Sequence, residues 1–204
     1  MADAATPFNQ KIRINALRLG ALILFPLLIL IHPYFGAEGP VYEVMEMTGV
    51  FLIIACVLGR FWCILYVGRH KNRSVVTDGP YSMTRNPLYF FSTLGAFGVG
   101  ILFGKLSLAL LLGGGVFLAL YLTARREAAY LAAEFGPEYA AYAARTPMFV
   151  PDPRLFRSEP TILISSAALG RNLRDAFVFL AAIPLAELSE ALGAHFDVLP
   201  FVLP

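Results

Sequence analysis

The residue types best suited to chemistry gather in residues 75–89, VVTDGPYSMTRNPLY, where turn formers, hydrogen-bond donors and aromatic side chains interrupt an otherwise hydrophobic chain. Gly79 and the proline after it predict a turn. Asn86 stands where a helix N-cap is expected, with Pro87 at the first helical position, where its missing N–H costs nothing. The free amides of such a helix start can hold a carboxylate or a phosphate. We interpret this stretch as a ligand-binding loop, although the same residues would suit a plain cap on a membrane helix.

The composition places this loop in a membrane protein. The chain has 204 residues, of which 58% are hydrophobic and 15% charged, and its mean hydropathy is +0.67. These values are too apolar for an ordinary soluble domain of this length. The net charge of +2 is too small to indicate nucleic-acid binding. No repeat or Gly/Ser linker divides the chain, so we expect residues 1–204 to form a single membrane domain.

Two membrane spans are expected in the N-terminal part, residues 1–67. The apolar run from 19 to 34 follows a basic segment and lacks a small-residue cleavage site after it, so we interpret it as an uncleaved first span. An acidic connection, residues 36–46, precedes a second span at about 47–67. Arg60 lies near the end of that span, and we expect its side chain to snorkel to the interface.

The third span, Leu88 to Gly104, and the fourth, starting near Leu106, are separated by little more than Lys105 and must form a tight helical hairpin. The third span is short for a full crossing. Small residues permit close helix approach in membranes, and here we expect that role from Gly95, Gly98, Gly100, Gly104, Gly113, Gly114 and Gly115.

The fourth apolar segment continues without a break into an amphipathic sequence. We expect one long helix that leaves the bilayer and ends near Glu134, at Gly136-Pro137, followed by a short helix from Glu138 to Arg145. The predicted fold is therefore an all-α integral membrane protein. It has about five transmembrane or membrane-embedded helices, a tight helical hairpin and a cytoplasmic amphipathic helix extension.

The C-terminal segment, residues 152–204, is predicted to be membrane-associated and helical. Its apolar runs at 161–169 and 176–185 are interrupted by Arg171 and Asp175, which stand four residues apart. An interfacial amphipathic helix and a fifth span with a buried ion pair are both open, and we favour a fifth element that is at least partly inserted.

Charge and cysteine placement complete the topology. Cys56 and Cys63 lie seven apart on one helix, as packing residues do, and we expect no metal site and no disulfide. Basic residues favour the cytoplasmic side, which places the N-terminus and the loop there. That side receives twelve of the sixteen lysines and arginines: Lys11, Arg13, Arg18, Arg69, Lys71, Arg73, Arg85, Arg125, Arg126, Arg145, Arg154 and Arg157.

The loop VVTDGPYSMTRNPLY, the hairpin and the following ARREAAYLAAEFGPEYAAYAARTPMFVP together resemble the membrane methyltransferases typified by isoprenylcysteine carboxyl methyltransferase and phosphatidylethanolamine N-methyltransferase. The resemblance covers residues 66–151, and it defines a methyltransferase-like cofactor-binding core at 68–151. It implies S-adenosylmethionine as cofactor, in a cytoplasm-facing pocket between the loop, the next helix start and the end of the long helix. It also implies a lipophilic or lipid substrate that arrives from the bilayer.

Carried onto this chain, the resemblance implies a set of cofactor contacts and no assigned catalytic residue. A carboxylate suits the helix start, ribose hydroxyls suit an acidic acceptor, and a sulfonium suits an aromatic face. The implied cofactor-binding residues are Arg73, Ser74, Val75, Val76, Tyr81, Asn86, Pro87, Leu88, Tyr89 and Glu127.

Departures from the family pattern bear on the acceptor. The family often has His where this chain has Asn86, and a second acid where it has Ala128. The family arginine that contacts a prenylcysteine corresponds to Thr123, with Arg126 close but rotated around the helix, so these two are weak substrate candidates. A phospholipid amine, a prenylated cysteine carboxylate and a small thiol all remain as acceptors. The alternatives in other classes are a non-enzymatic membrane scaffold or transport protein and an NADPH-dependent enzyme like the sterol reductases.

Overall fold

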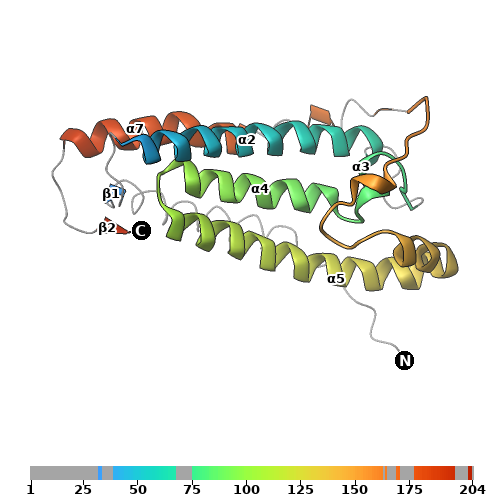
Figure 1. The fold of residues 1–204 in the computed structure, drawn as a ribbon. Coiled ribbons are helices and arrows are strands. Elements are labelled where there is room, and N and C mark those ends of the chain that lie inside the picture. The colour runs from blue at the N-terminus through green and yellow to red at the C-terminus, as the bar shows by residue number, and fades with distance from the viewer. Residues whose placement is uncertain are drawn as a thin grey trace.

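The computed structural model describes residues 32–33, 39–67, 75–162, 164, 169–170, 177–195 and 202–203, and it shows a bundle of helices (Figure 1). Helix α4 (Pro87–Leu102) is the central element and packs against α2 (Pro40–Val67), α5 (Leu106–Arg145) and α7 (Ala182–His195). The short helix α3 (Pro80–Met83) and the 3₁₀ turn η1 (Pro153–Leu155) lie together at one end, called here the polar end. Near the opposite end, β1 (His32–Pro33) pairs in parallel with β2 (Val202–Leu203).

The all-α membrane architecture is confirmed, with α2 and α5 long and apolar enough to cross a bilayer. Helix α2 begins at Pro40, seven residues before the expected start, so Glu43 and Glu46 belong to the helix and not to a connection. The expected first span lies outside the described residues except for His32–Pro33, which is extended. Its helix therefore cannot continue to residue 34 as predicted.

The tight hairpin between α4 and α5 is also confirmed. With 16 residues, α4 is about 24 Å long and shorter than the roughly 30 Å hydrocarbon core, as expected. The turn at Phe103–Lys105 is closed by the backbone bond from the Gly104 amide to the Ile101 carbonyl, 2.9 Å. Lys105 is only 3% exposed, so the tip of the hairpin is packed.

The glycines of α4 face two neighbouring helices, α5 and α2. A methyl group on Gly100 would strike the backbone of Ala109 in α5, so these two helices touch through their main chains. Gly98 instead faces α2, and a methyl group on Gly114 or Gly115 would meet nothing among the described residues. The expected close approach of helices is therefore confirmed at Gly98 and Gly100, while the described residues show none at Gly114 and Gly115.

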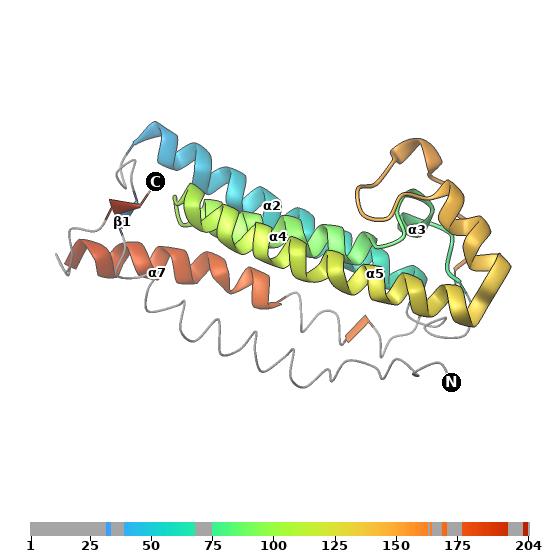
Figure 2. The same cartoon turned by 90° about the horizontal axis from the view of Figure 1, so that it is seen from below.

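Helix α5 changes direction where the sequence predicts an end. Gly136 has a φ of 52° and ψ of −124°, which is not helical, and Pro137 follows it. The straight part of α5 is longer than α4, and it projects past the rest of the bundle before it reaches the bend, as Figure 2 shows. The bend carries the last turns, with Tyr139 and Tyr142 both buried, back over α3.

Helix α7 completes the bundle at the end opposite α3. Ala182 and Ala186 are buried in one core with Ile53 of α2 and Leu102 of α4. On the other face of α7 Leu188 is 48% exposed. The C-terminal element is therefore packed against α2 and α4, and its partial insertion stays a prediction. The segment that holds Arg171 and Asp175 lies outside the described residues.

Arg60 does not snorkel as predicted. The residue is only 9% exposed, its Nη1 donates to the Ser92 hydroxyl of α4 at 2.6 Å, and its guanidinium lies over the ring of Phe179 at 5.9 Å. The Arg60 guanidinium finds partners inside the protein and does not extend to the interface, because Ser92 and Phe179 both face this turn of α2. Cys56 and Cys63, one turn to either side of it, are buried free cysteines, as expected of packing residues.

The close contact at Gly100 gives a testable prediction. Gly100→Ala should lower the free energy of unfolding by about 1–3 kcal/mol, because α4 and α5 must separate to admit one methyl group. Gly114→Ala, whose added methyl group meets nothing among the described residues, is the matched control and should be neutral or stabilising by helix propensity. Thermal unfolding in detergent measures both; equal midpoints for the two variants would contradict the main-chain contact.

Candidate active site

The candidate site begins with the turn that sets α3 across the polar end. Gly79 has a φ of 60°, a conformation that only glycine adopts at little cost, and its amide bonds to the Arg157 carbonyl at 2.8 Å. The Ser82 hydroxyl donates to the Gly79 carbonyl at 2.7 Å and accepts from the Arg157 amide at 3.0 Å. The turn is therefore closed upon itself and joined to a segment almost eighty residues further along the chain.

That distant segment, residues 147–158, is called the strap here because it runs along the whole turn. The amide of Arg85 donates to the Pro147 carbonyl at 2.9 Å, and the amide of Asp152 donates to the Met83 carbonyl at 3.0 Å. Thr84, fully buried, donates its hydroxyl to the Phe149 carbonyl at 3.0 Å. The strap thus satisfies polar groups at the end of the short helix α3 and in the residues that follow it.

Asn86 occupies the N-cap position of α4 but does not cap it with its side chain. Its backbone has φ −130° and ψ 56°, and its Nδ2 donates to the Met148 carbonyl of the strap at 2.8 Å. The prediction of a side-chain cap is wrong, because the strap offers a carbonyl to the amide nitrogen. Pro87 is buried at the first helical position as predicted, and Leu88 is partly exposed in the first turn.

Tyr81, Tyr89 and Glu127 converge from three elements on one region. Tyr89 of α4 donates its hydroxyl to Glu127 Oε1 of α5 at 2.8 Å, across the polar end of the hairpin. Burial raises the pKa of Tyr81 well above its usual value, and Cys63, Tyr142, Tyr89 and Glu127 act in the same direction. The phenol of Tyr81 therefore stays neutral and lies within electrostatic reach of Tyr89 and Glu127.

The carbonyl side of the turn has a second tyrosine. Tyr142, in the last turns of α5, donates its hydroxyl to the Tyr81 carbonyl at 2.7 Å. Burial raises the pKa of Tyr142, so its phenol remains a donor throughout the physiological range. The bend at Gly136 brings Tyr142 to this position. The bond from Tyr142 then holds the backbone of Tyr81 in place.

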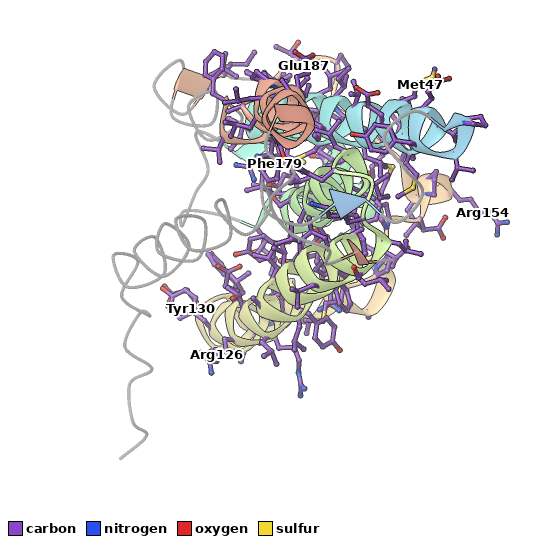
Figure 3. The ribbon with its side chains drawn as sticks, turned by 90° about the vertical axis from the view of Figure 1, so that its left-hand side faces the viewer. Met47, Arg126, Tyr130, Arg154, Phe179 and Glu187 are labelled. Carbon is purple, nitrogen blue, oxygen red and sulfur yellow. The ribbon has the colours of Figure 1, made fainter. Side chains whose placement is uncertain are left out.

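The remaining predicted site residues are placed less centrally. Val75 and Val76 lie partly exposed in the segment before the turn, and Arg73 and Ser74 lie outside the described residues. Of the weak substrate candidates, Thr123 donates its hydroxyl to the Ala119 carbonyl of its own helix at 2.8 Å. Arg126 is exposed and projects away from α2, α4 and α7, as Figure 3 shows.

The strap was not foreseen as part of the site. Its Phe149 is 7% exposed and meets the ring of Phe117 of α5 edge to face, with centroids 4.9 Å apart. Phe156 packs against Trp62 of α2 at 5.9 Å. The sequence offered only Thr146-Pro147 and Pro151-Asp152-Pro153 as turn signals, and these do not say which element the segment covers.

Comparisons with known proteins identify the family of this chain. The family model for phospholipid methyltransferase matches residues 41–138, from the start of α2 to just past the bend in α5. The cobalt-zinc-cadmium resistance protein CzcN of Cupriavidus metallidurans is 33% identical over 189 residues, which cover 92% of this chain and 86% of that protein. The nickel-cobalt-cadmium resistance protein NccN of Alcaligenes xylosoxydans xylosoxydans is 38% identical over 157 residues, or 76% of this chain and 73% of that protein. No solved structure gives a significant match.

The fold and the matched helices define a membrane methyltransferase built from a helical hairpin and its flanking spans. The chain belongs to the phospholipid methyltransferase family, within the broader group of membrane methyltransferases that includes the isoprenylcysteine enzymes. The matched region ends before the strap and α7, whereas the alignment with CzcN extends over nearly the whole chain.

The bond from Asn86 to the strap gives a second prediction. Asn86→Asp should lower the free energy of unfolding by about 1–3 kcal/mol, because a carboxylate replaces the donor and faces the Met148 carbonyl. Asn86→Ala, which removes the donor without adding a charge, should cost less. Thermal unfolding of the two variants measures the difference, and an Asp variant as stable as the wild type would rule out this bond as a support of the strap.

Proposed function

We propose that the protein is an S-adenosylmethionine-dependent methyltransferase that acts on a lipophilic acceptor reached from the bilayer. The observation that carries the proposal is the convergence of Tyr81, Tyr89 and Glu127 at the polar end of the hairpin. These groups come from three elements and lie at the water boundary of an apolar bundle. A polar cofactor and an apolar acceptor can meet there.

The chemistry of these groups fits the proposed cofactor. The carboxylate of Glu127 is a strong acceptor for two ribose hydroxyls, and only one of its bonds, from Tyr89, is made within the described protein. The rings of Tyr81 and Tyr89 are aromatic faces that favour a sulfonium. In the first turn of α4 Pro87 has no N–H and the amides of Tyr89 and Phe90 both donate to the Asn86 carbonyl at 3.1 Å, which leaves the Leu88 amide as the donor for a carboxylate.

The contribution of the protein to methyl transfer is one of position and exclusion of water. When bound, S-adenosylmethionine supplies an electrophilic methyl group for in-line displacement by the acceptor. The Tyr89–Glu127 bond fixes the spacing of α4 and α5, and the Tyr142 bond fixes the turn that carries Tyr81. Such fixed geometry is the main source of catalysis in a displacement of this kind. We assign no general base, because Glu127 is committed to the cofactor.

The names of the relatives bear on the acceptor. CzcN and NccN are named for resistance to cobalt, nickel, zinc or cadmium. Among the described residues, no group of three or more His, Cys, Asp or Glu side chains is placed to hold a metal ion. We infer that this chain contributes to metal resistance, the role for which these relatives are named, through methylation of a membrane component.

The cofactor assignment is tested by Glu127→Ala. Binding of S-adenosylhomocysteine should weaken by about 1–3 kcal/mol, the cost of leaving ribose hydroxyls without a charged acceptor. Glu134→Ala is the matched control, because Glu134 is an exposed acid seven residues further along the same helix. Calorimetric titration of the purified protein measures both. Unchanged affinity in Glu127→Ala would remove Glu127 from the pocket, and binding of NADPH in place of S-adenosylhomocysteine would favour the reductase alternative.

The acceptor is tested by incubation of membranes with methyl-labelled S-adenosylmethionine. Membranes that contain the wild-type protein should incorporate label into a lipid-extractable fraction, and membranes with Glu127→Ala should incorporate roughly ten-fold less or lower, following from the affinity loss. The same incorporation is then measured with membranes from cells grown with cadmium or cobalt. Label found equally with the wild type and the variant would refute a methyltransferase that depends on this pocket.

A further inference from the structure

Three arginines lie near Tyr142 at the polar end, close enough for their charges to act on its phenol. Arg145 ends the helix that carries Tyr142, three residues later. Arg85 and Arg157 are brought to the same place by backbone bonds between the turn and the strap. We call Arg85, Arg145 and Arg157 the arginine junction.

The positive charge of the arginine junction is poorly compensated by the described residues. Only Arg157 has a carboxylate partner there, with its Nε 3.6 Å from Asp78 Oδ1, and both side chains are well exposed, at 50% and 36%. Arg85 and Arg145 form no ion pair with a described residue, and the buried Nε of Arg85 has no described hydrogen-bond partner. The nearby carboxylate of Asp152 is used to accept from a backbone amide of η1 at 3.0 Å. The junction therefore has free donors for an anion.

The arginine junction is separate from the proposed cofactor pocket. Burial dominates the raised pKa of Tyr142, and the charges of Arg85, Arg145 and Arg157 oppose it. Burial raises the pKa of Tyr81, and Tyr142, Tyr89 and Glu127 act in the same direction. None of the three arginines is among the residues proposed to hold the cofactor.

The strap beside the arginine junction has the character of a membrane-surface segment. Leu155 and Phe156 are 36% and 50% exposed, and the Phe156 ring lies against Trp62 in the last turns of the spanning helix α2. Tryptophan of a membrane helix is typical of the headgroup region. Arg154, on the same strap, projects sideways from the bundle (Figure 3). The strap therefore extends beyond the helices at the depth where lipid phosphates lie.

We propose that the arginine junction binds the phosphate of an anionic phospholipid headgroup and thereby holds the strap against the turn. A guanidinium group pairs with phosphate oxygens through two parallel hydrogen bonds. When several guanidinium groups surround one phosphate, the negative charge of the phosphate offsets the repulsion between them. Exposed apolar side chains on the strap would rest among the acyl chains of the same leaflet. This site lies beyond the proposed function, since it requires neither the cofactor nor the acceptor.

Thermal unfolding of the full chain in a non-ionic detergent tests the site. Micelles doped with phosphatidylglycerol should raise the wild-type midpoint by roughly 2–4 °C over micelles doped with phosphatidylcholine, which carries the same phosphate without net negative charge. Arg145→Gln should lose most of this rise, and Arg145→Lys should keep part of it. Arg125→Gln, an exposed arginine on the straight part of α5, should keep all of it.

Four results would overturn the proposal. Equal midpoints in the two lipids, or the same rise in Arg145→Gln as in the wild type, would exclude an anionic headgroup at the junction. Inorganic phosphate that reproduces the whole rise at matched ionic strength would replace the lipid by a free anion. Weaker S-adenosylhomocysteine binding by Arg145→Gln in phosphatidylcholine alone would assign the arginine to the cofactor pocket instead of a separate site.

Discussion

Every part of the polar end depends on one constraint: a stretch at the boundary of a bilayer whose only helix is the four-residue α3 must find protein partners for its backbone. Residues 78–86 lie between membrane helices, where lipid tails offer no hydrogen bonds. The strap supplies those bonds, and the fully buried Thr84 hydroxyl lies at the centre of the contact. Because the strap follows the bend at Gly136, the shape of α5 and the shape of the turn are determined together. A site at this turn therefore exists only in the assembled bundle.

The helices and the glycine bend could be predicted because they depend on local patterns. Length and hydropathy define α2 and α5, and Gly136-Pro137 ends a straight helix whatever its neighbours are. The start of α2 was misplaced because Glu43 and Glu46 were assigned to a polar connection, although acids are favourable in the first turns of a helix. Arg60 was misplaced because its partner Ser92 belongs to another helix, and no pattern within α2 reveals it.

Prediction of the candidate site was limited in the same way. The loop residues could be selected by type, and the family resemblance added Glu127, whose bond to Tyr89 the structure shows. The side chain of Asn86 could not be assigned, because a cap and a bond to Met148 require the same residue type. The strap and Tyr142 were missed because they are distant in sequence, and only the folded bend brings them to the turn.

The Tyr89–Glu127 bond also bears on how such a pocket could exchange its contents. Helices α4 and α5 are joined at one end by the packed tip at Lys105, they touch through their main chains at Gly100 and Ala109, and near the polar end they are joined by the Tyr89–Glu127 bond. Glu127 lies about 32 Å along α5 from the tip. A pivot of about 5° there would part the two helices by roughly 3 Å at Glu127. A small rotation at the buried tip is thus enough to separate α4 from α5 near Glu127, while α4 stays packed against α2 and α7.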